Sequence, residues 1–125
     1  MTVHAKPIAT KPVEIAEAFT RAWASGKLEE AARYVADDVV FDGPMQKSTG
    51  LKPYIEGLTK LSQAVIGVRM IAAYGDDEHA LLMYDLLTEA YGTLTCAKYL
   101  TVRDGRIARD QLTFDSHNIR NAPKH

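Results

Sequence analysis

Lys98 is the residue whose position in the sequence most strongly suggests a chemical role. It lies in the segment TLTCAKYLTV, residues 93–102, whose side chains alternate between two rows as those of a strand do. Lys98 falls in the apolar row, together with Cys96 and Leu100. A lysine in a core-facing row needs a carboxylate partner, water or a chemical role, because burying an unpaired ammonium group is costly. We therefore expect Lys98 to be a cation inside a pocket.

Two aspartates are candidates to pair with Lys98 and to act as an acid or a base. Asp85 lies in ALLMYDLLTEA, where both faces are apolar, and Asp42 ends VVFD just before a Gly-Pro turn. We hypothesise that Lys98 pairs with one of these aspartates. The pair would then orient or stabilise an anionic or enolising carbonyl ligand, with Asp42, Asp85 and Lys98 as the catalytic residues.

Each of these three residues also has a purely structural interpretation. Lys98 could extend its stem along apolar residues and reach water near a strand end. Asp42 could open the turn, where an aspartate is favoured for local hydrogen bonding. Asp85 could belong to a structural ion pair, since an unpaired carboxylate in the middle of an apolar strand would be costly.

Aromatic, methionine and other apolar side chains are the candidates for the wall of a pocket, although such residues are also typical of an ordinary core. The predicted substrate-binding residues are Phe19, Trp23, Tyr34, Phe41, Met45, Tyr54, Leu58, Met83, Leu100, Phe114 and Asp115. The four histidines have no paired spacing of the kind that metal ligands show. The glycines form neither a dinucleotide fingerprint nor a phosphate loop. We expect no metal and no cofactor.

The composition indicates one compact domain. The chain has 125 residues, 46% of them hydrophobic and 25% charged, with a formal net charge of -1. It has no basic run that could neutralise phosphates, so nucleic acid is not expected as a partner. No apolar stretch is long enough to cross a membrane. Cys96 is the single cysteine, which is typical of a reducing compartment, and we expect a soluble, cytoplasmic protein.

Helical spacing dominates the first half of the chain and strand-like segments the second. The pattern predicts helices over residues 11–25, 27–36 and 48–63, a short strand over 39–42, and strands near 65–74, 79–90, 93–103 and 106–115. The last four are joined by short turns and must form antiparallel hairpins. The expected fold is an α+β domain whose helices cover one face of a curved sheet. The domain would span residues 11–116, between a flexible arm (1–10) and a tail (117–125).

Two long segments resemble a known group of proteins. SGKLEEAARYVADDVVFDGPMQKSTGLKPYIEGLTKL is similar to the first half of the nuclear transport factor 2-like superfamily, particularly its SnoaL-like, polyketide cyclase-like branch. VRDGRIARDQLTFD is similar to the final hairpin of that superfamily. The resemblance covers residues 11–116. It implies a cone-shaped, cystatin-like fold, in which three N-terminal helices pack on a curved, mainly antiparallel sheet that encloses an apolar pocket.

The resemblance also argues against standard ketosteroid isomerase activity. The general-base aspartate of those enzymes falls on Asp42, which matches. Their oxyanion-binding tyrosine falls on Phe19 and their hydrogen-bonding aspartic acid on Lys98. The two donors that stabilise the dienolate in such a site are therefore missing.

Limonene epoxide hydrolase activity is not expected either. The pocket aspartate of those enzymes falls on Asp85, but the neighbouring arginine becomes Met83 and the aspartate of the last strand becomes Leu112. For the SnoaL-like cyclases, the resemblance implies an acid/base aspartate in the last strand. Asp110 and Asp115 both stay open for that role.

Two classes of function follow. The first is a cofactor-independent acid/base enzyme of the cyclase, isomerase or dehydratase type, acting on a small hydrophobic molecule that bears a carbonyl group. The second is a non-catalytic binding or scaffold module with the same pocket. A homodimer is expected through the outer face of the sheet. In this interpretation Leu81, Met83, Asp85 and Leu87 face the pocket, and the outer patch consists of Leu82, Tyr84, Leu86, Ala97 and Tyr99.

Overall fold

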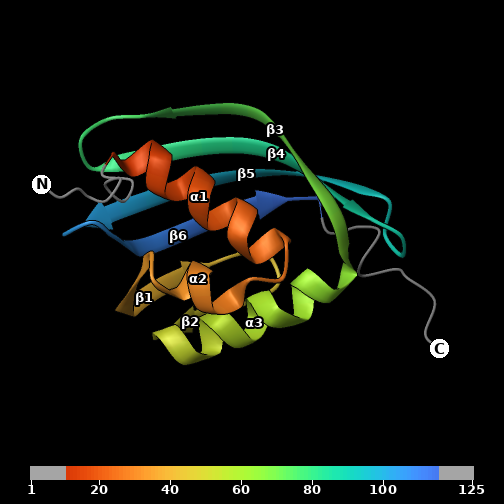
Figure 1. The fold of residues 1–125 in the computed structure, drawn as a ribbon, viewed down its shortest axis with the longest axis horizontal. Helices are drawn as coiled ribbons and strands as arrows, with labels where there is room; N and C mark the ends of the chain where they lie inside the picture. Colours follow the sequence, from red (N-terminus) through yellow and green to blue (C-terminus); the bar gives the residue numbers. More distant parts are fainter. Residues whose placement is uncertain (1–10, 116–125) are drawn as a thin grey trace, which may run out of the picture.

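The computed structural model describes residues 11–115 as three helices and one curved six-stranded sheet (Figure 1). The helices are α1 (Pro12–Ala24), α2 (Leu28–Ala32) and α3 (Leu51–Ala64). The strands are β1 (Val35–Asp42), β2 (Lys47–Thr49), β3 (Val65–Gly75), β4 (His79–Thr88), β5 (Thr93–Arg103) and β6 (Arg106–Phe114). The predicted arm (1–10) and tail (117–125) lie outside the described residues, as does residue 116 of the predicted domain. Within residues 11–115 no helix combines the length and the apolar character needed to cross a membrane.

The strand order is β2-β1-β6-β5-β4-β3, and every neighbouring pair is antiparallel except β1 and β6. The helix α1 lies along the inner face of β3, β4 and β5, while α3 lies beside β1 and β2 (Figure 1). The α+β class and the antiparallel meander of the last four strands are as predicted. The structure adds the short strand β2, which the sequence pattern did not predict.

The helix α1 carries the apolar stripe that joins the helices to the sheet. Ile15, Phe19 and Trp23 follow each other at four-residue spacing and are at most 1% exposed. Pro12 is the first helical residue, where its missing N–H costs no hydrogen bond. Gly26 follows the end of the helix with φ of 81°, a conformation that glycine adopts without strain.

The second predicted helix is shorter than expected and the following strand is longer. The strand β1 begins at Val35 rather than at residue 39, and it runs parallel to β6 with Phe41 beside Asp110. Pairing with the last strand of the sheet, far away in the sequence, stabilises this extended conformation. The tertiary pairing therefore overrides the helical pattern of residues 33–36, as tertiary context often overrides local propensity.

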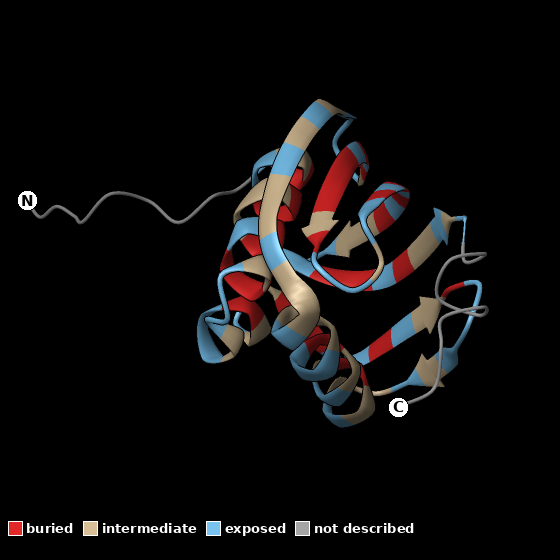
Figure 2. Cartoon of the chain, turned by 90° about the vertical axis from the view of Figure 1, so that its right-hand side faces the viewer, coloured by how far each residue is buried: buried red, intermediate tan, exposed pale blue. Residues whose placement is uncertain are grey.

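The register between β4 and β5 corrects the predicted orientation of β4. Directly opposed residues of an antiparallel pair point to the same face, and Leu82 lies opposite Lys98 while Tyr84 lies opposite Cys96. The inner row of β4 is Ala80, Leu82, Tyr84 and Leu86, each at most 2% exposed. Leu81, Met83 and Asp85 therefore point outward, not into the pocket. The alternation of buried and exposed bands along the sheet is visible in Figure 2.

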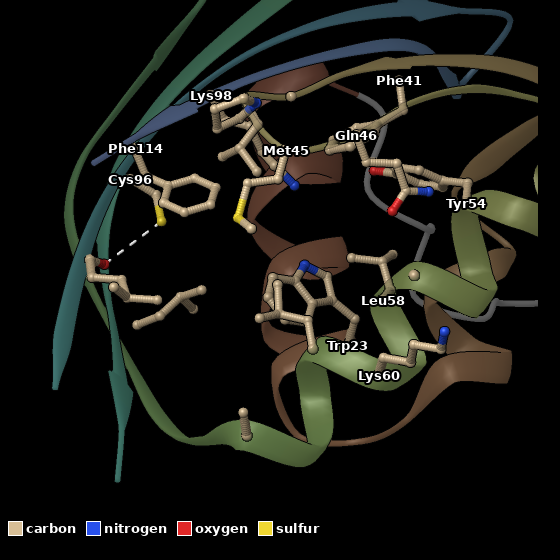
Figure 3. A pocket seen from close by; sticks show the side chains of 18 of the residues that line it. Trp23, Phe41, Met45, Gln46, Tyr54, Leu58, Lys60, Cys96, Lys98 and Phe114 are labelled. Atoms are coloured by element: carbon tan, nitrogen blue, oxygen red, sulfur yellow. Dashed lines mark hydrogen bonds between the residues drawn. The ribbon is translucent and has the colours of Figure 1, made fainter. Parts of the chain in front are cut away.

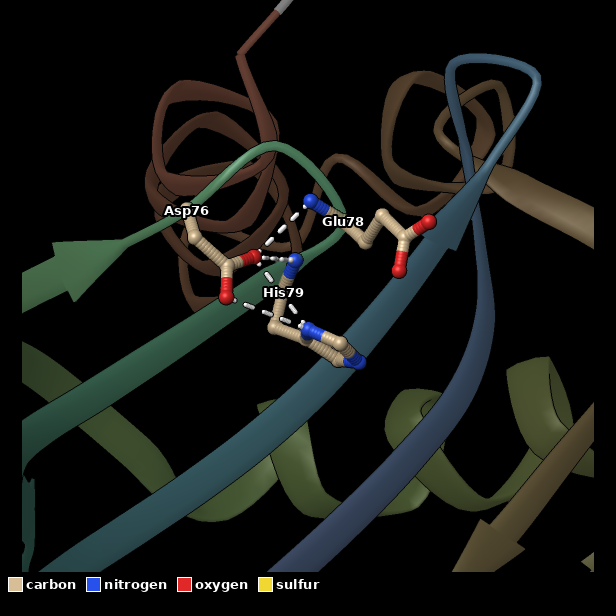
Figure 4. A network of polar contacts seen from close by, with 3 residues as sticks. All are labelled: Asp76, Glu78 and His79. Carbon is tan, nitrogen blue, oxygen red and sulfur yellow. Dashed lines mark hydrogen bonds and ion pairs between the residues drawn. The ribbon is translucent and has the colours of Figure 1, made fainter.

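The turn between β3 and β4 is closed by an aspartate side chain (Figure 4). Asp76 Oδ1 accepts hydrogen bonds from the backbone N–H groups of Glu78, at 2.8 Å, and of His79, at 2.7 Å. These two bonds lower the pKa of Asp76, because they favour its charged form. The His79 ring also stacks on Tyr99 of β5, with 5.2 Å between the ring centroids. The turn thereby fixes the start of β4 on its neighbour.

Candidate functional site

A cavity of about 500 Å³ opens between α1, α3, the segment 43–46 and the inner face of β4, β5 and β6 (Figure 3). Its size is within the range of small-molecule sites. Six of the predicted wall residues line it: Trp23, Phe41, Met45, Tyr54, Leu58 and Phe114. Most of the remaining wall is also aliphatic or aromatic. The wall of the cavity is therefore mainly apolar.

Lys98 lines this cavity and forms a buried ion pair with Asp110. The Lys98 Nζ lies 3.0 Å from Asp110 Oδ2, and the two side chains are 2% and 0% exposed. Lys98 is directly opposite Leu112, and Asp110 is directly opposite Leu100, so the pair is diagonal across β5 and β6. Asp110 does not line the cavity. Its carboxylate contacts the Lys98 ammonium group on the side away from the cavity.

The Tyr54 hydroxyl of α3 donates a hydrogen bond to the same oxygen, Asp110 Oδ2. Burial, together with the charge of Asp110, raises the pKa of Tyr54 well above its usual value, so the phenol stays protonated. Phe19 stacks on the Tyr54 ring at 6.0 Å and Phe41 contacts it at 5.6 Å, both measured between ring centroids. Two aromatic rings and a carboxylate thus hold Tyr54 in one orientation.

Aromatic faces complete the surroundings of the lysine. Lys98 Nζ lies 5.2 Å from the centroid of the Phe19 ring and 5.8 Å from that of Trp23. Such contacts stabilise a cation through the ring quadrupole. Asp110 is the acidic residue that the structure pairs with Lys98, and an ammonium has three donors in all. The arrangement can therefore offer N–H groups of Lys98 to an oxygen atom of a ligand.

Asp85 is not in the cavity, so its predicted pairing with Lys98 is wrong. It lies on the outer face, where Arg69 Nη2 and Thr95 Oγ1 each donate to it at 2.6 Å. The bond from Thr95 and then that from Arg69 lower the pKa of Asp85, and burial opposes them only in part. Asp85 therefore belongs to a structural ion pair with Arg69. This is the structural interpretation given for Asp85 in the sequence analysis.

Asp42 also lies away from the cavity. It is beside Gln111 on the outer side of the sheet, and its Oδ1 lies 3.7 Å from Nζ of the exposed Lys47. The predicted catalytic trio of Asp42, Asp85 and Lys98 is therefore not brought together. Of the three, Lys98 alone faces the cavity.

Five predicted wall residues do not line the cavity. Phe19 and Leu100 are fully buried in the core. Tyr34 is partly buried against that core, Met83 is 43% exposed on the outer face, and Asp115 is exposed after the end of β6. Met83 points outward because the orientation of the whole strand β4 is opposite to the predicted one. Phe19 nevertheless shapes the site, because its ring stacks on Tyr54 and contacts the Lys98 ammonium group.

Asp110 is the partner of Lys98, and the sequence pattern left it as one of two candidates in the last strand. In the segment 106–114 it alternates with the apolar Leu112 and Phe114, while Arg109 and Gln111 fall in the other row. The same argument that placed Lys98 in a core-facing row would have selected it. Lining residues that were not predicted include Lys60, Tyr84, Tyr91, Cys96 and Leu112.

Cys96 lines the cavity beside Lys98 and is buried. Burial raises the pKa of its thiol to about 11, and the nearby Lys98 opposes this only in part. Its Sγ donates to the carbonyl of Leu94 at 3.6 Å. At neutral pH the group is thus a protonated, apolar part of the wall. Among residues 11–115 no three His, Cys, Asp or Glu side chains are grouped so that they could hold a metal ion.

Comparison with known proteins identifies the family. The SnoaL-like domain family matches residues 16–110. A crystal structure of a protein from Kribbella flavida is 31% identical, covers 90% of this chain and 93% of its own, and superposes with a TM-score of 0.85. An NTF2-like protein of unknown function from Cytophaga hutchinsonii is 15% identical, with 93% and 100% coverage and a TM-score of 0.78.

A third solved structure is an LEH-like epoxide hydrolase from M. tuberculosis, which is 19% identical, with coverage of 91% of this chain and 90% of its own and a TM-score of 0.74. At such identities the likeness shows the fold alone. No curated protein matches the sequence. The match over residues 16–110 and the relative at 31% identity agree with the resemblance drawn from the sequence. The chain has an NTF2-like, cystatin-like fold and belongs to the SnoaL-like domain family.

Proposed function

We propose that the cavity binds a small hydrophobic molecule through a carbonyl oxygen, and that Lys98 polarises this carbonyl in an acid/base reaction that proceeds through an enolate. The observation that carries the proposal is the buried ion pair of Lys98 and Asp110, of which only the lysine faces the cavity. An ammonium placed where negative charge develops stabilises an enolate strongly in a site of low dielectric.

The energetics of the pair support a role beyond stability. Replacing a buried ion pair by apolar side chains of similar size is often neutral or even stabilising. The wall around Lys98 consists of residues such as Cys96 and Leu112, which an aliphatic side chain would match well. A lysine at this position therefore contributes little that the fold itself requires.

Asp110 and Tyr54 act as positioning residues in this proposal. Asp110 compensates the charge of Lys98, and Tyr54 occupies the second acceptor direction of Asp110 Oδ2. Neither the Tyr54 proton nor the carboxylate is needed to contact the ligand. The two residues hold the Lys98 ammonium group in a fixed direction, which reduces the reorganisation that a reaction would require.

A non-catalytic binding protein is the second candidate, and one observation favours it. The cavity-lining residues among 11–115 include no Asp, Glu or His, so no ordinary general base faces the ligand. A carrier needs only the apolar wall and one donor. An enzyme of this design would have to pass the α-proton to water or to a group on the substrate.

Hydrogen exchange at the α-carbon of a ketone separates the two candidates. We would incubate the protein with 1-tetralone in D₂O and follow the loss of the α-proton signal by NMR. Accelerated exchange by the wild type, lost in the double variant Lys98→Met/Asp110→Asn, supports the enzyme. Lys52→Met, which changes an exposed lysine of α3 outside the cavity, serves as the matched control. Binding without accelerated exchange supports the carrier, and equal binding by the double variant contradicts both.

A further inference from the structure

The indole N–H of Trp23 is a second donor at the cavity. Trp23 lines the cavity and is 1% exposed, and its Nε1 is buried with no hydrogen-bond partner among the residues that the structure describes. An indole N–H can only donate, and a buried donor without a partner is unfavourable. An acceptor on a ligand would satisfy it.

Lys98 lies over the ring of Trp23, and both residues line the cavity. The Lys98 Nζ is 5.8 Å from the centroid of the Trp23 ring. In Figure 3 the indole nitrogen occupies the edge of the ring on the side of Met45 and Lys98. The two groups come from α1 and β5, which pack on each other through the core. Both donors belong to residues that line one cavity, so an oxyanion bound in it can be offered both N–H groups.

The charges that line the cavity have one sign. Lys60 and Lys98 are its charged lining residues among 11–115, and both are cationic. Asp110 offsets Lys98, but it lies behind the lysine and outside the lining. A ligand inside the cavity therefore meets N–H donors and positive charge, and it meets no carboxylate within the described part of the wall.

We propose that Trp23 Nε1 and Lys98 Nζ together form a two-donor site for an oxyanion, and that the ligand is a hydrophobic molecule bound as a carboxylate, phenolate or enolate. The inference rests on the proposed function, in which Lys98 binds a ligand oxygen, and it adds the second donor and the charge of the ligand. Charge-assisted hydrogen bonds are about twice as strong as neutral ones, so an anion benefits from both donors more than a ketone does.

The single tryptophan of the chain makes the test direct. We would label the protein with ¹⁵N and titrate it with 2-naphthoate, with the neutral isostere 2-acetylnaphthalene and with naphthalene. Trp23 gives the one indole N–H signal. We expect 2-naphthoate to move the indole proton downfield, as a new hydrogen bond does, and to bind about tenfold more tightly than 2-acetylnaphthalene. Naphthalene should cause no downfield shift.

Two variants separate the donors. Trp23→Phe should weaken 2-naphthoate binding about tenfold, the loss expected for one hydrogen bond to a charged group, and naphthalene binding should change little. Because Trp23 is a core residue, the wild-type titration decides if this variant does not fold. Lys98→Met/Asp110→Asn should lose the preference for 2-naphthoate over naphthalene, and Lys52→Met should keep it.

The outcomes distinguish this inference from the proposed function. If binding of 2-naphthoate depends on Lys98 while the indole proton does not move downfield, the two-donor site is wrong and the function of Lys98 stands. If the double variant binds 2-naphthoate as tightly as the wild type, both proposals are wrong. Failure of all three probes to bind at millimolar concentration would also overturn both.

Discussion

Lys98 and Asp110 lie diagonally across β5 and β6, and together they place a buried ion pair between the core and the cavity. Each residue stands in a row of apolar side chains on the inner face of the sheet. The pair is enclosed on the side of Asp110 and faces the cavity on the side of Lys98. This asymmetry connects the stability of the sheet to the chemistry of the site.

Removing one member of the pair should destabilise the protein strongly. Lys98→Met leaves the Asp110 carboxylate buried without a counter-charge, and we expect the free energy of unfolding to fall by about 3–5 kcal/mol. Lys98→Met/Asp110→Asn should recover most of that loss. Lys47→Met removes an exposed ion pair with Asp42 and should cost less than about 1 kcal/mol. Urea unfolding measures all three, and equal losses for the two single variants would contradict the prediction.

Tyr54 should make the protein sensitive to alkaline pH. Its folded pKa is raised by burial and by Asp110, whereas the unfolded chain releases the proton near the ordinary value of about 10. The stabilisation is therefore complete below about pH 10 and is lost as the pH rises towards the folded pKa. Tyr84 carries a similar shift, mainly from burial.

The phenol of Tyr54 can be removed with little change in shape. Tyr54→Phe should lower the free energy of unfolding at pH 7 by about 1–3 kcal/mol, because a buried acceptor loses its donor. It should also flatten the decline of stability above about pH 10. Tyr74→Phe, at a residue that is 71% exposed, is the matched control. A wild-type pH profile in the Tyr54 variant would contradict the raised pKa of the buried phenol.

The alternation of residue types predicts the face of a strand only where the two faces differ. In β5 the rows differ: threonines mark the outer row, and Lys98 was placed correctly on the inner one. In β4 both rows are apolar, so the pattern carried no information and the orientation of Asp85 was predicted the wrong way round. The orientation of β4 follows from the register that puts Leu82 opposite Lys98. A register depends on residues far apart in the chain.

The partner of Lys98 could not be predicted for a related reason. Asp110 stands in the inner row of β6, which its alternation with Leu112 indicates. Its closeness to Lys98 depends on a shift in register between Thr101 and Val102, where β5 and β6 depart from regular pairing. Such an irregularity shifts the pairing of the two strands by about one residue. Composition and periodicity give the helices and the meander, and they leave this last step open.

Asp85 should make the stability of the protein fall at acid pH and should not affect ligand binding. Hydrogen bonds from Thr95 and Arg69 lower its pKa below that of the unfolded chain. Its stabilisation is therefore present above about pH 4 and is lost as the pH falls through the folded pKa. Asp85→Asn should make the acid-side loss of stability less steep, and Thr95→Val should do so in part. Unchanged binding of 2-naphthoate in both variants is expected, and impaired binding would contradict the outward position of Asp85.

The outer face of the sheet should pair two copies of the chain, with Tyr99 as the one residue kept from the patch expected from the sequence, because Leu82, Tyr84 and Leu86 are buried. We propose an interface formed by Tyr74, Leu81, Met83 and Tyr99, which are 42–71% exposed on neighbouring strands. Contiguous apolar patches of this kind mark interaction sites. Sedimentation at micromolar concentration should show a dimer, and Met83→Lys should give a monomer. Ile66→Lys, which adds the same charge at an exposed position of β3, should leave the dimer intact. A monomeric wild type would contradict the proposal.

Cys96 should report on the occupancy of the cavity. It is the chain's only cysteine and it lines the cavity, so a single labelled position is expected. Burial raises its pKa to about 11, and the thiolate is the reactive form. The folded protein should therefore react with a maleimide at pH 8 about 10²-fold more slowly than the chain in urea, where the thiol has a pKa of about 8.5. Bound 2-naphthoate should slow the reaction further, and Cys96→Ser should show no labelling. Labelling of the folded protein at the rate seen in urea would mean that the thiol is not held in the apolar wall.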